Sequence, residues 1–126
     1  MLIVMAMMKD GLSHAEACSK IWLVDSNGLL IENRSDGGIT GHKVQFAKAV
    51  PPMNKLNEIV RLVKPSVLIG AAAVGGAFTP EILKDMATFN QRPVIFALSN
   101  PTSKAECTAE QAYEHTDVHY IILTSP

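Results

Sequence analysis

Three segments of this chain have residue types that could contact a ligand, and each directly follows a short apolar run. They are Asp25-Ser26, Gly70-Ala71-Ala72-Ala73 and Ser99-Asn100-Pro101. Continuously apolar runs that alternate with helical patterns are typical of strands in a parallel α/β sheet. Ligands of such sheets bind outside the carboxyl ends of the strands. We therefore expect the three segments to line one binding crevice.

Each segment also has a simpler interpretation. Asp25 suits the acidic residue that accepts hydrogen bonds from the ribose of a dinucleotide, and it suits equally well a turn that begins before Asn27-Gly28. Ser26 is small and neutral and leaves room for a 2′-phosphate. Lys43 is a candidate partner for that phosphate, although a solvated surface lysine is the default. Asn100 offers an amide at the mouth of the crevice, or it begins an ordinary Asn-Pro turn.

The small residues from Gly70 onward allow a backbone to approach a ligand closely. They could lie against the ribose and nicotinamide of a cofactor. Close packing of a helix on a sheet would explain the same composition.

The surrounding pattern predicts the elements that position these segments. Apolar runs predict strands at 21–24, 66–70, 93–98 and 120–123. Helical patterns cover 2–8 and 56–63, and further helices begin after the capping residues Ser13, Thr79 and Thr108. A turn at Ser26-Asn27-Gly28, a polar loop from 31 to 41 and a short helix around Phe46 complete the pattern.

Composition narrows the classes of function. The chain has 126 residues, 48% hydrophobic and 18% charged, with a net charge of -1. This apolar content suits a packed domain, and the charge balance provides no basic face for nucleic acid. No G-x-S-x-G, H-E-x-x-H or P-loop motif occurs, and the glycines at 70–76 do not form G-x-G-x-x-G. We therefore expect no nucleic-acid partner and none of the chemistries that those motifs carry.

Cysteine and histidine spacing indicates no metal site. Cys18 and Cys107 lie far apart, and we expect both to remain reduced thiols of an intracellular protein. His115 and His119 are four residues apart, but the apolar run after His119 places it in a strand. The apolar first eight residues are too short to span a bilayer and lack the features of a signal peptide. We expect them to be the end of a buried helix whose beginning is absent.

Three segments resemble the malic enzymes of animals: KIWLVDS at 20–26, IGAAAVGGAF at 69–78 and RPVIFALSNPTSKAEC at 92–107. The third is highly specific to that family, and the resemblance extends over about residues 2–116. It implies oxidative decarboxylation of malate to pyruvate and CO2 with NADP, NAD being possible, and with Mg2+ or Mn2+. It also implies a homo-oligomer, a dimer or tetramer, and a cytoplasmic location, with the mitochondrial matrix as the alternative.

The resemblance assigns roles to individual residues. It places Asp25 on the adenosine ribose, and it matches Ser26 and Lys43 to positions that favour NADP. Ala72 and Ala73 would lie on the nicotinamide side. Asn100 would contact both the nicotinamide end of the cofactor and the substrate.

The same resemblance implies what the chain lacks. The glycine-rich pyrophosphate loop, its strand, the tyrosine and lysine acid/base pair, the substrate arginine and the acidic metal ligands all belong upstream. The expected fold is therefore an incomplete Rossmann-like parallel sheet without its first strand and glycine-rich loop. Residues 1–126 would be a partial NAD(P)-binding domain, family-like to about 116, with a divergent tail at 117–126. We expect the isolated chain to be marginally stable and inactive; the alternative is a non-catalytic isoform that binds nucleotide or full-length subunits.

Overall fold

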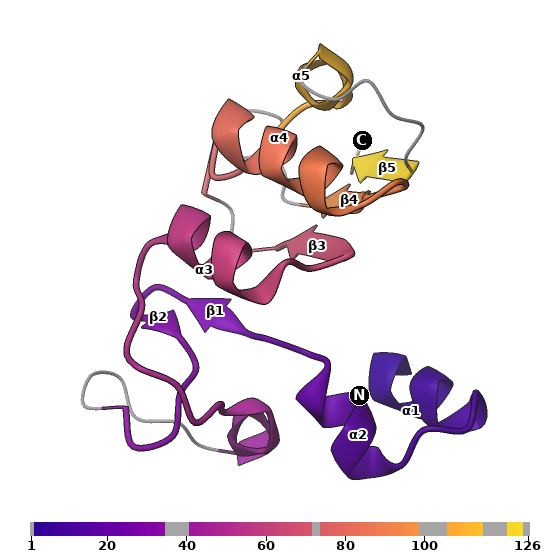
Figure 1. Cartoon of the computed structure of the whole chain (residues 1–126), viewed down its shortest axis with the longest axis vertical. Helices are drawn as coiled ribbons and strands as arrows, with labels where there is room; N and C mark the ends of the chain where they lie inside the picture. The colour runs from indigo at the N-terminus through magenta and orange to yellow at the C-terminus, as the bar shows by residue number, and fades with distance from the viewer. Residues whose placement is uncertain (1, 35–40, 72–73, 99–105, 115–120, 125–126) are drawn as a thin grey trace. The chain divides into compact units, whose positions relative to one another are not determined.

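The computed structural model describes residues 2–34, 41–71, 74–98, 106–114 and 121–124. The chain divides into two compact units, Met1–Lys55 and Leu56–Pro126. Figure 1 gives the order of the elements along the chain. Each unit has its own sheet and its own cluster of buried side chains.

The first unit contains two α-helices, a two-stranded hairpin and a 3-10 helix. Their bounds are α1 Leu2–Lys9, α2 His14–Ser19, β1 Val24–Asp25, β2 Gly28–Leu29 and η1 Gly41–Phe46. Gly11 follows α1 with a φ of 103°, which is the left-handed conformation that glycine adopts at a helix end without steric cost. Ser13 and Glu16 form the predicted capping box at the start of α2.

The prediction of a parallel strand at 21–24 is wrong in its bounds and its pairing. The strand covers Val24–Asp25 and pairs antiparallel with Gly28–Leu29. The turn predicted at Ser26-Asn27-Gly28 is found at Ser26-Asn27, with Gly28 beginning β2, and it is the cause, because a two-residue turn returns the chain beside its own strand. Gly28 has a φ of 100°, and an added Cβ would come within 2.4 Å of the Met53 carbonyl oxygen.

A small apolar cluster holds the first unit together. Ala17 and Cys18 of α2 and Phe46 of η1 are buried. The Lys48 ammonium donates a hydrogen bond to the Cys18 carbonyl oxygen at 2.9 Å and lies 5.4 Å from the centre of the Trp22 ring. Partial burial lowers the pKa of Lys48.

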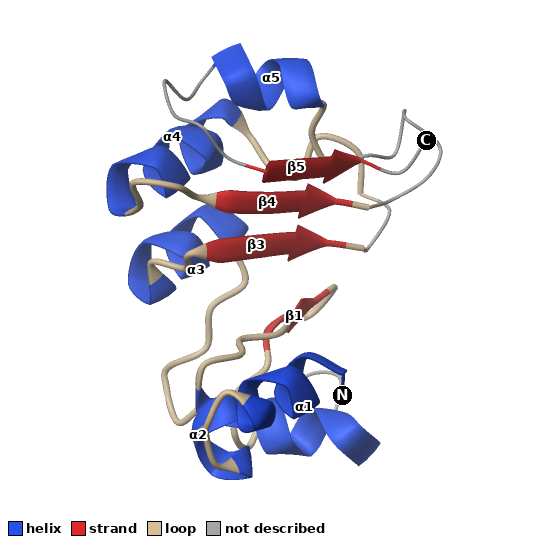
Figure 2. Ribbon diagram, turned by 90° about the vertical axis from the view of Figure 1, so that its right-hand side faces the viewer, coloured by secondary structure: helices blue, strands red, loops and turns tan. Residues whose placement is uncertain are grey.

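The second unit alternates helices with strands, as the sequence predicted. Its elements are α3 Leu56–Val63, β3 Val67–Gly70, α4 Pro80–Phe89, β4 Val94–Ala97, α5 Ala109–Glu114 and β5 Ile121–Thr124. The three strands are parallel in the order β3-β4-β5, and their arrows point the same way in Figure 2. The predicted α/β class with a parallel sheet is confirmed.

The core of the second unit lies between this sheet and helices α3 and α4. Ile95 and Ala97 of β4 have no exposed surface and pack with Val60 of α3 and Met86 of α4. Alternate residues of β3 face the other way, and Val67 and Ile69 are 44% and 46% exposed. One face of β3 therefore packs toward the core of this unit, and its other face is partly exposed.

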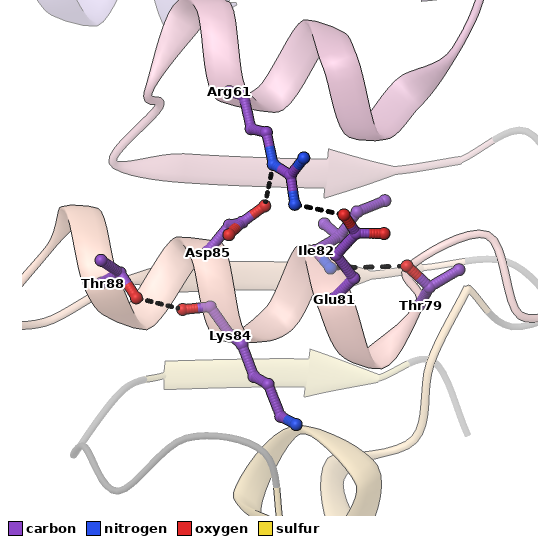
Figure 3. Close-up of polar contacts among 7 residues, drawn as sticks. All are labelled: Arg61, Thr79, Glu81, Ile82, Lys84, Asp85 and Thr88. Carbon is purple, nitrogen blue, oxygen red and sulfur yellow. Dashed lines mark hydrogen bonds and ion pairs between the residues drawn. The ribbon is translucent and has the colours of Figure 1, made fainter.

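A charged cluster joins α3 to α4 on the surface. Figure 3 shows the Arg61 guanidinium between two carboxylates of α4. It donates to Asp85 at 3.0 Å and to Glu81, and the hydrogen bond that Asp85 accepts from it is the largest cause of its raised pKa. Arg61 is about half exposed, so the cluster orients the two helices more than it stabilises them.

Candidate functional site

Asp25 closes β1 and is fixed by its own turn. The Asn27 backbone N–H donates to the Asp25 carboxylate at 2.9 Å, which is the local side-chain contact that turns of this kind use. The simpler interpretation of Asp25 as a turn initiator is therefore correct for the structure. A ribose contact is compatible with that role, because the turn uses only one acceptor position of the carboxylate.

Arg34 makes a two-pronged ion pair with the same carboxylate. Its two terminal nitrogens donate to the two Asp25 oxygens at 2.8 and 2.9 Å. The Arg34 side chain is only 7% exposed and the Asp25 side chain 27%. Hydrogen bonding from Arg34 is the largest cause of the lowered pKa of Asp25; burial opposes it, and the Asn27 N–H adds to it. Asp25 is therefore ionised and its charge is largely compensated by Arg34.

Ser26 and Lys43 are the other predicted site residues of the first unit. Ser26 is exposed at the tip of the hairpin, and Lys43 is exposed on η1. The positive charge of Lys43 contributes to the lowered pKa of Asp25, which places it within electrostatic range. Lys43 thus acts electrostatically on Asp25, Ser26 follows Asp25 in the turn, and Arg34 joins them; the roles of Ser26 and Lys43 toward a cofactor stay predictions.

An open hollow adjoins the ion pair within the first unit. Its volume is about 270 Å³. It is lined by the polar residues Asn27, Asn33, Arg34 and Asn54 and by the apolar residues Leu29, Ile31, Pro52 and Met53.

The second predicted segment follows β3 in the other unit. Gly70 is buried at the end of β3, and Ala71 after it is exposed. The Leu98 N–H donates to the Gly70 carbonyl oxygen at 2.9 Å and extends the β3–β4 pairing by one residue. Ala72, Ala73 and Asn100 lie outside the described residues, so their roles stay predictions. The meeting of both regions in one crevice also stays a prediction.

Arg34 is the site residue that sequence reasoning missed. It stands at the start of a polar segment that reads as a loop, and no spacing rule links it to Asp25. Its place nine residues after Asp25 could have identified it as a candidate, because an arginine near the acidic residue of a dinucleotide fold can accommodate a 2′-phosphate.

The described residues show neither a cluster of metal ligands nor a membrane-spanning helix. No group of three or more His, Cys, Asp or Glu side chains there could hold a metal ion. The helices of that same part of the chain are all too short or too polar to cross a bilayer. Cys18 and Cys107 are buried free thiols, as predicted.

Comparison with known proteins gives consistent matches. The family described as "Malic enzyme, NAD binding domain" matches residues 1–126. The chain is 60% identical over 116 residues to the NADP-dependent malic enzyme of Anas platyrhynchos. The aligned residues make up 92% of this chain and 20% of that protein. This chain is 57% identical over 116 residues to the mitochondrial NADP-dependent malic enzyme of Homo sapiens, covering 92% and 19%. The chain thus spans about a fifth of the length of the curated relatives it matches.

Proposed function

This chain belongs to the malic enzyme family, and on that premise we propose that it is part of an NADP-dependent enzyme that decarboxylates malate oxidatively to pyruvate and CO2. We assign residues 1–126 to a partial NAD(P)-binding domain with a Rossmann-like sheet, family-like to about residue 116. The relatives named NADP-dependent malic enzyme support the cofactor. NADP, when bound, accepts the hydride that the reaction removes from malate.

The observation that carries the NADP assignment is the compensated charge of Asp25. A free carboxylate at this position would bind the 2′-hydroxyl of NAD and repel the 2′-phosphate of NADP. Here Arg34 occupies both oxygens of Asp25, and Lys43 adds a second positive charge. Arg34 and Lys43 would bind the 2′-phosphate, with Ser26 leaving space for it.

A titration of the 126-residue chain tests this assignment. Trp22, the single tryptophan, lies three residues before Asp25 and reports binding by its fluorescence. We expect NADP to bind more tightly than NAD, and Lys43→Gln to weaken NADP by about fivefold while leaving NAD unchanged. Lys55→Gln removes an equally exposed lysine of the same unit and should change neither affinity. Equal binding of NAD and NADP by the unmodified chain would contradict the assignment.

We further propose that the chain alone does not oxidise malate. Oxidation needs a base for the hydroxyl proton and a metal that polarises the substrate oxygen. The resemblance assigns neither group to residues of this chain, and we therefore assign no metal-binding role to it. Production of NADPH from malate by the purified chain, measured at 340 nm, would overturn this proposal.

A second candidate function is that of a non-catalytic isoform that binds full-length subunits. The exposed Val67 and Ile69 on the open face of β3 favour it, because soluble proteins seldom leave a sheet face of this kind uncovered. Co-purification with full-length subunits, and its loss in a Val67→Thr/Ile69→Thr variant, would support this function. Failure of the unmodified chain to co-purify would exclude it.

Assembly and location follow the same premise. We propose a homo-oligomer, dimeric or tetrameric, for the full-length enzyme, and the cytoplasm as its compartment. The mitochondrial matrix is the alternative, because two of the relatives are named as mitochondrial enzymes. Fluorescence microscopy of the full-length tagged protein would separate the two compartments.

A further inference from the structure

Cys18 is a thiol with a histidine beside it, on helix α2 of the first unit. Residues four apart share one face of a helix, and the Cys18 Sγ lies 3.8 Å from Nδ1 and 4.0 Å from Nε2 of His14. Cys18 is 5% exposed, whereas His14 is on the surface. The thiol is therefore in contact with a base that reaches solvent, which is the arrangement that activates a cysteine nucleophile.

A positive charge approaches Cys18 from a different segment of the same unit. The Lys48 ammonium donates to the Cys18 carbonyl oxygen at 2.9 Å. The Lys48 backbone is held by hydrogen bonds to Leu30 and from Glu32 at 3.1 and 2.9 Å. Attraction to Cys18 acts on Lys48 against the effect of burial, which lowers the pKa of Lys48. Because this attraction needs negative charge on the sulfur, Lys48 favours the thiolate over the thiol.

The other titratable groups of α2 and of the elements packed against it, α1 and η1, lie in solvent as far as the structure describes them. Glu16 accepts a hydrogen bond from the Ser13 N–H at 3.3 Å in the capping box. The remaining exposed groups of these elements and of the turns beside them are Lys9, Asp10, Lys20, His42 and Lys43. Water and salt screen such charges, so His14 and Lys48 dominate the surroundings of Cys18.

Cys107 has the opposite electrostatic surroundings. It lies in the second unit, is 2% exposed, and follows Glu106, which is buried against Gly70 at the end of β3. Burial is the main cause that raises the pKa of the Cys107 thiol to about 11, and the negative charge of Glu106 adds to it. The chain thus has two buried thiols, one beside a carboxylate and the other beside a base and an ammonium.

We propose that Cys18 is a modification site for small electrophiles, peroxides above all, with His14 as its base. With hydrogen peroxide, His14 takes the thiol proton and the thiolate attacks one peroxide oxygen. An S–O bond forms, the O–O bond breaks, and the departing hydroxide takes the proton from His14 and leaves as water. The sulfur is oxidised by two electrons to a sulfenic acid, and the peroxide is reduced. This site lies within one unit and does not depend on the binding of NADP.

Labelling of the folded 126-residue chain at pH 7 measures both cysteines in one sample. The reagent is iodoacetamide, or hydrogen peroxide followed by dimedone, which traps sulfenic acids, and mass spectrometry gives the rate at each thiol. We expect Cys18 to react about tenfold faster than Cys107. Equal rates at the two cysteines, in a chain whose Trp22 fluorescence still shows a cooperative urea transition, would contradict the proposal.

His14→Gln separates a base from a merely structural neighbour, and because His14 is exposed the core of the unit stays intact. We expect the rate at Cys18 to fall about tenfold at pH 7. Its rise with pH should move from the range in which a histidine titrates, about 6.5, to that of a free thiol, about 8.5. Lys48→Gln should lower the rate about threefold. His42→Gln, which removes an exposed histidine of η1, should change neither rate nor profile. An identical rate and pH profile in His14→Gln and the unmodified chain would show the proposal to be wrong.

Discussion

Replacing Arg34 by methionine tests how far the Asp25–Arg34 pair stabilises the first unit. Methionine keeps much of the length and apolar volume of the arginine stem and removes its charge and donors. Asp25 then loses both hydrogen bonds from the guanidinium and keeps the one from the Asn27 N–H. The variant leaves a carboxylate that is only 27% exposed without its main partner.

The expected loss of unfolding free energy lies between the values known for ion pairs on the surface and in the interior of proteins. Exposed ion pairs contribute up to about 1 kcal/mol, whereas removing one partner of a fully buried pair costs about 3–5 kcal/mol. Arg34 is nearly buried, but Asp25 can recover part of its hydration through its exposed quarter. We therefore expect Arg34→Met to lower the free energy of unfolding by about 1–2 kcal/mol at neutral pH.

The loss should depend on pH in a defined direction. The folded-state pKa of Asp25 lies below its usual value of 3.8, mainly through hydrogen bonding from Arg34. A lowered pKa stabilises the fold above the unfolded-state value, and this stabilisation disappears as the pH falls through the folded-state value. The difference between the unmodified chain and Arg34→Met should therefore be full at neutral pH and shrink below pH 3.8.

Urea unfolding followed by Trp22 fluorescence measures this difference. Arg92→Met removes an exposed arginine and serves as the matched control. A double-mutant cycle with Asp25→Asn isolates the energy of the pair from other effects of the substitution. Equal destabilisation at neutral and acidic pH, or additive effects of Arg34→Met and Asp25→Asn, would refute the assignment of this energy to the ion pair.

Three further predictions concern the second unit. Gly70→Ala should destabilise it by about 1–3 kcal/mol in thermal unfolding, because the added Cβ would come within 3 Å of the buried Glu106 side chain and of the Phe78 ring; the added substitution Glu106→Ala should restore part of the loss, and no restoration would disprove the contact with Glu106. Thr79→Ala removes the cap of α4 and should cost about 1 kcal/mol in urea unfolding, while Thr79→Ser should cost much less. Cys107, whose pKa is raised to about 11 mainly by burial, should resist iodoacetamide at neutral pH until urea unfolds the chain, and mass spectrometry of the native protein showing the label there would contradict its burial.

Helices and their caps could be predicted from sequence because the interactions that specify them are local. The Ser13–Glu16 capping box and the Thr108–Gln111 pair each join residues three apart. The β3 and β4 strands were also predicted, since continuous apolar runs between helices leave few other conformations. Their bounds agree with the prediction to within one or two residues.

The strand around residue 24 shows where local patterns fail. The apolar run at 21–24 resembles a buried parallel strand, but pairing depends on where the chain goes next. The turn at Ser26-Asn27 returns it at once, and the Leu29 N–H then donates to the Met53 carbonyl oxygen at 2.8 Å. That contact spans 24 residues, and no periodicity of the local sequence encodes it.

The same distinction between local and tertiary information applies to the candidate site. Sequence alone determined that Asp25 ends an apolar run and that Gly70 ends another, because residue type and the position of a run are local properties. Only the tertiary structure decided that Arg34 compensates Asp25 and that Glu106 lies beneath Gly70. Ion pairing and burial depend on which distant segments pack together, so the charge of each part of the site was settled by the fold.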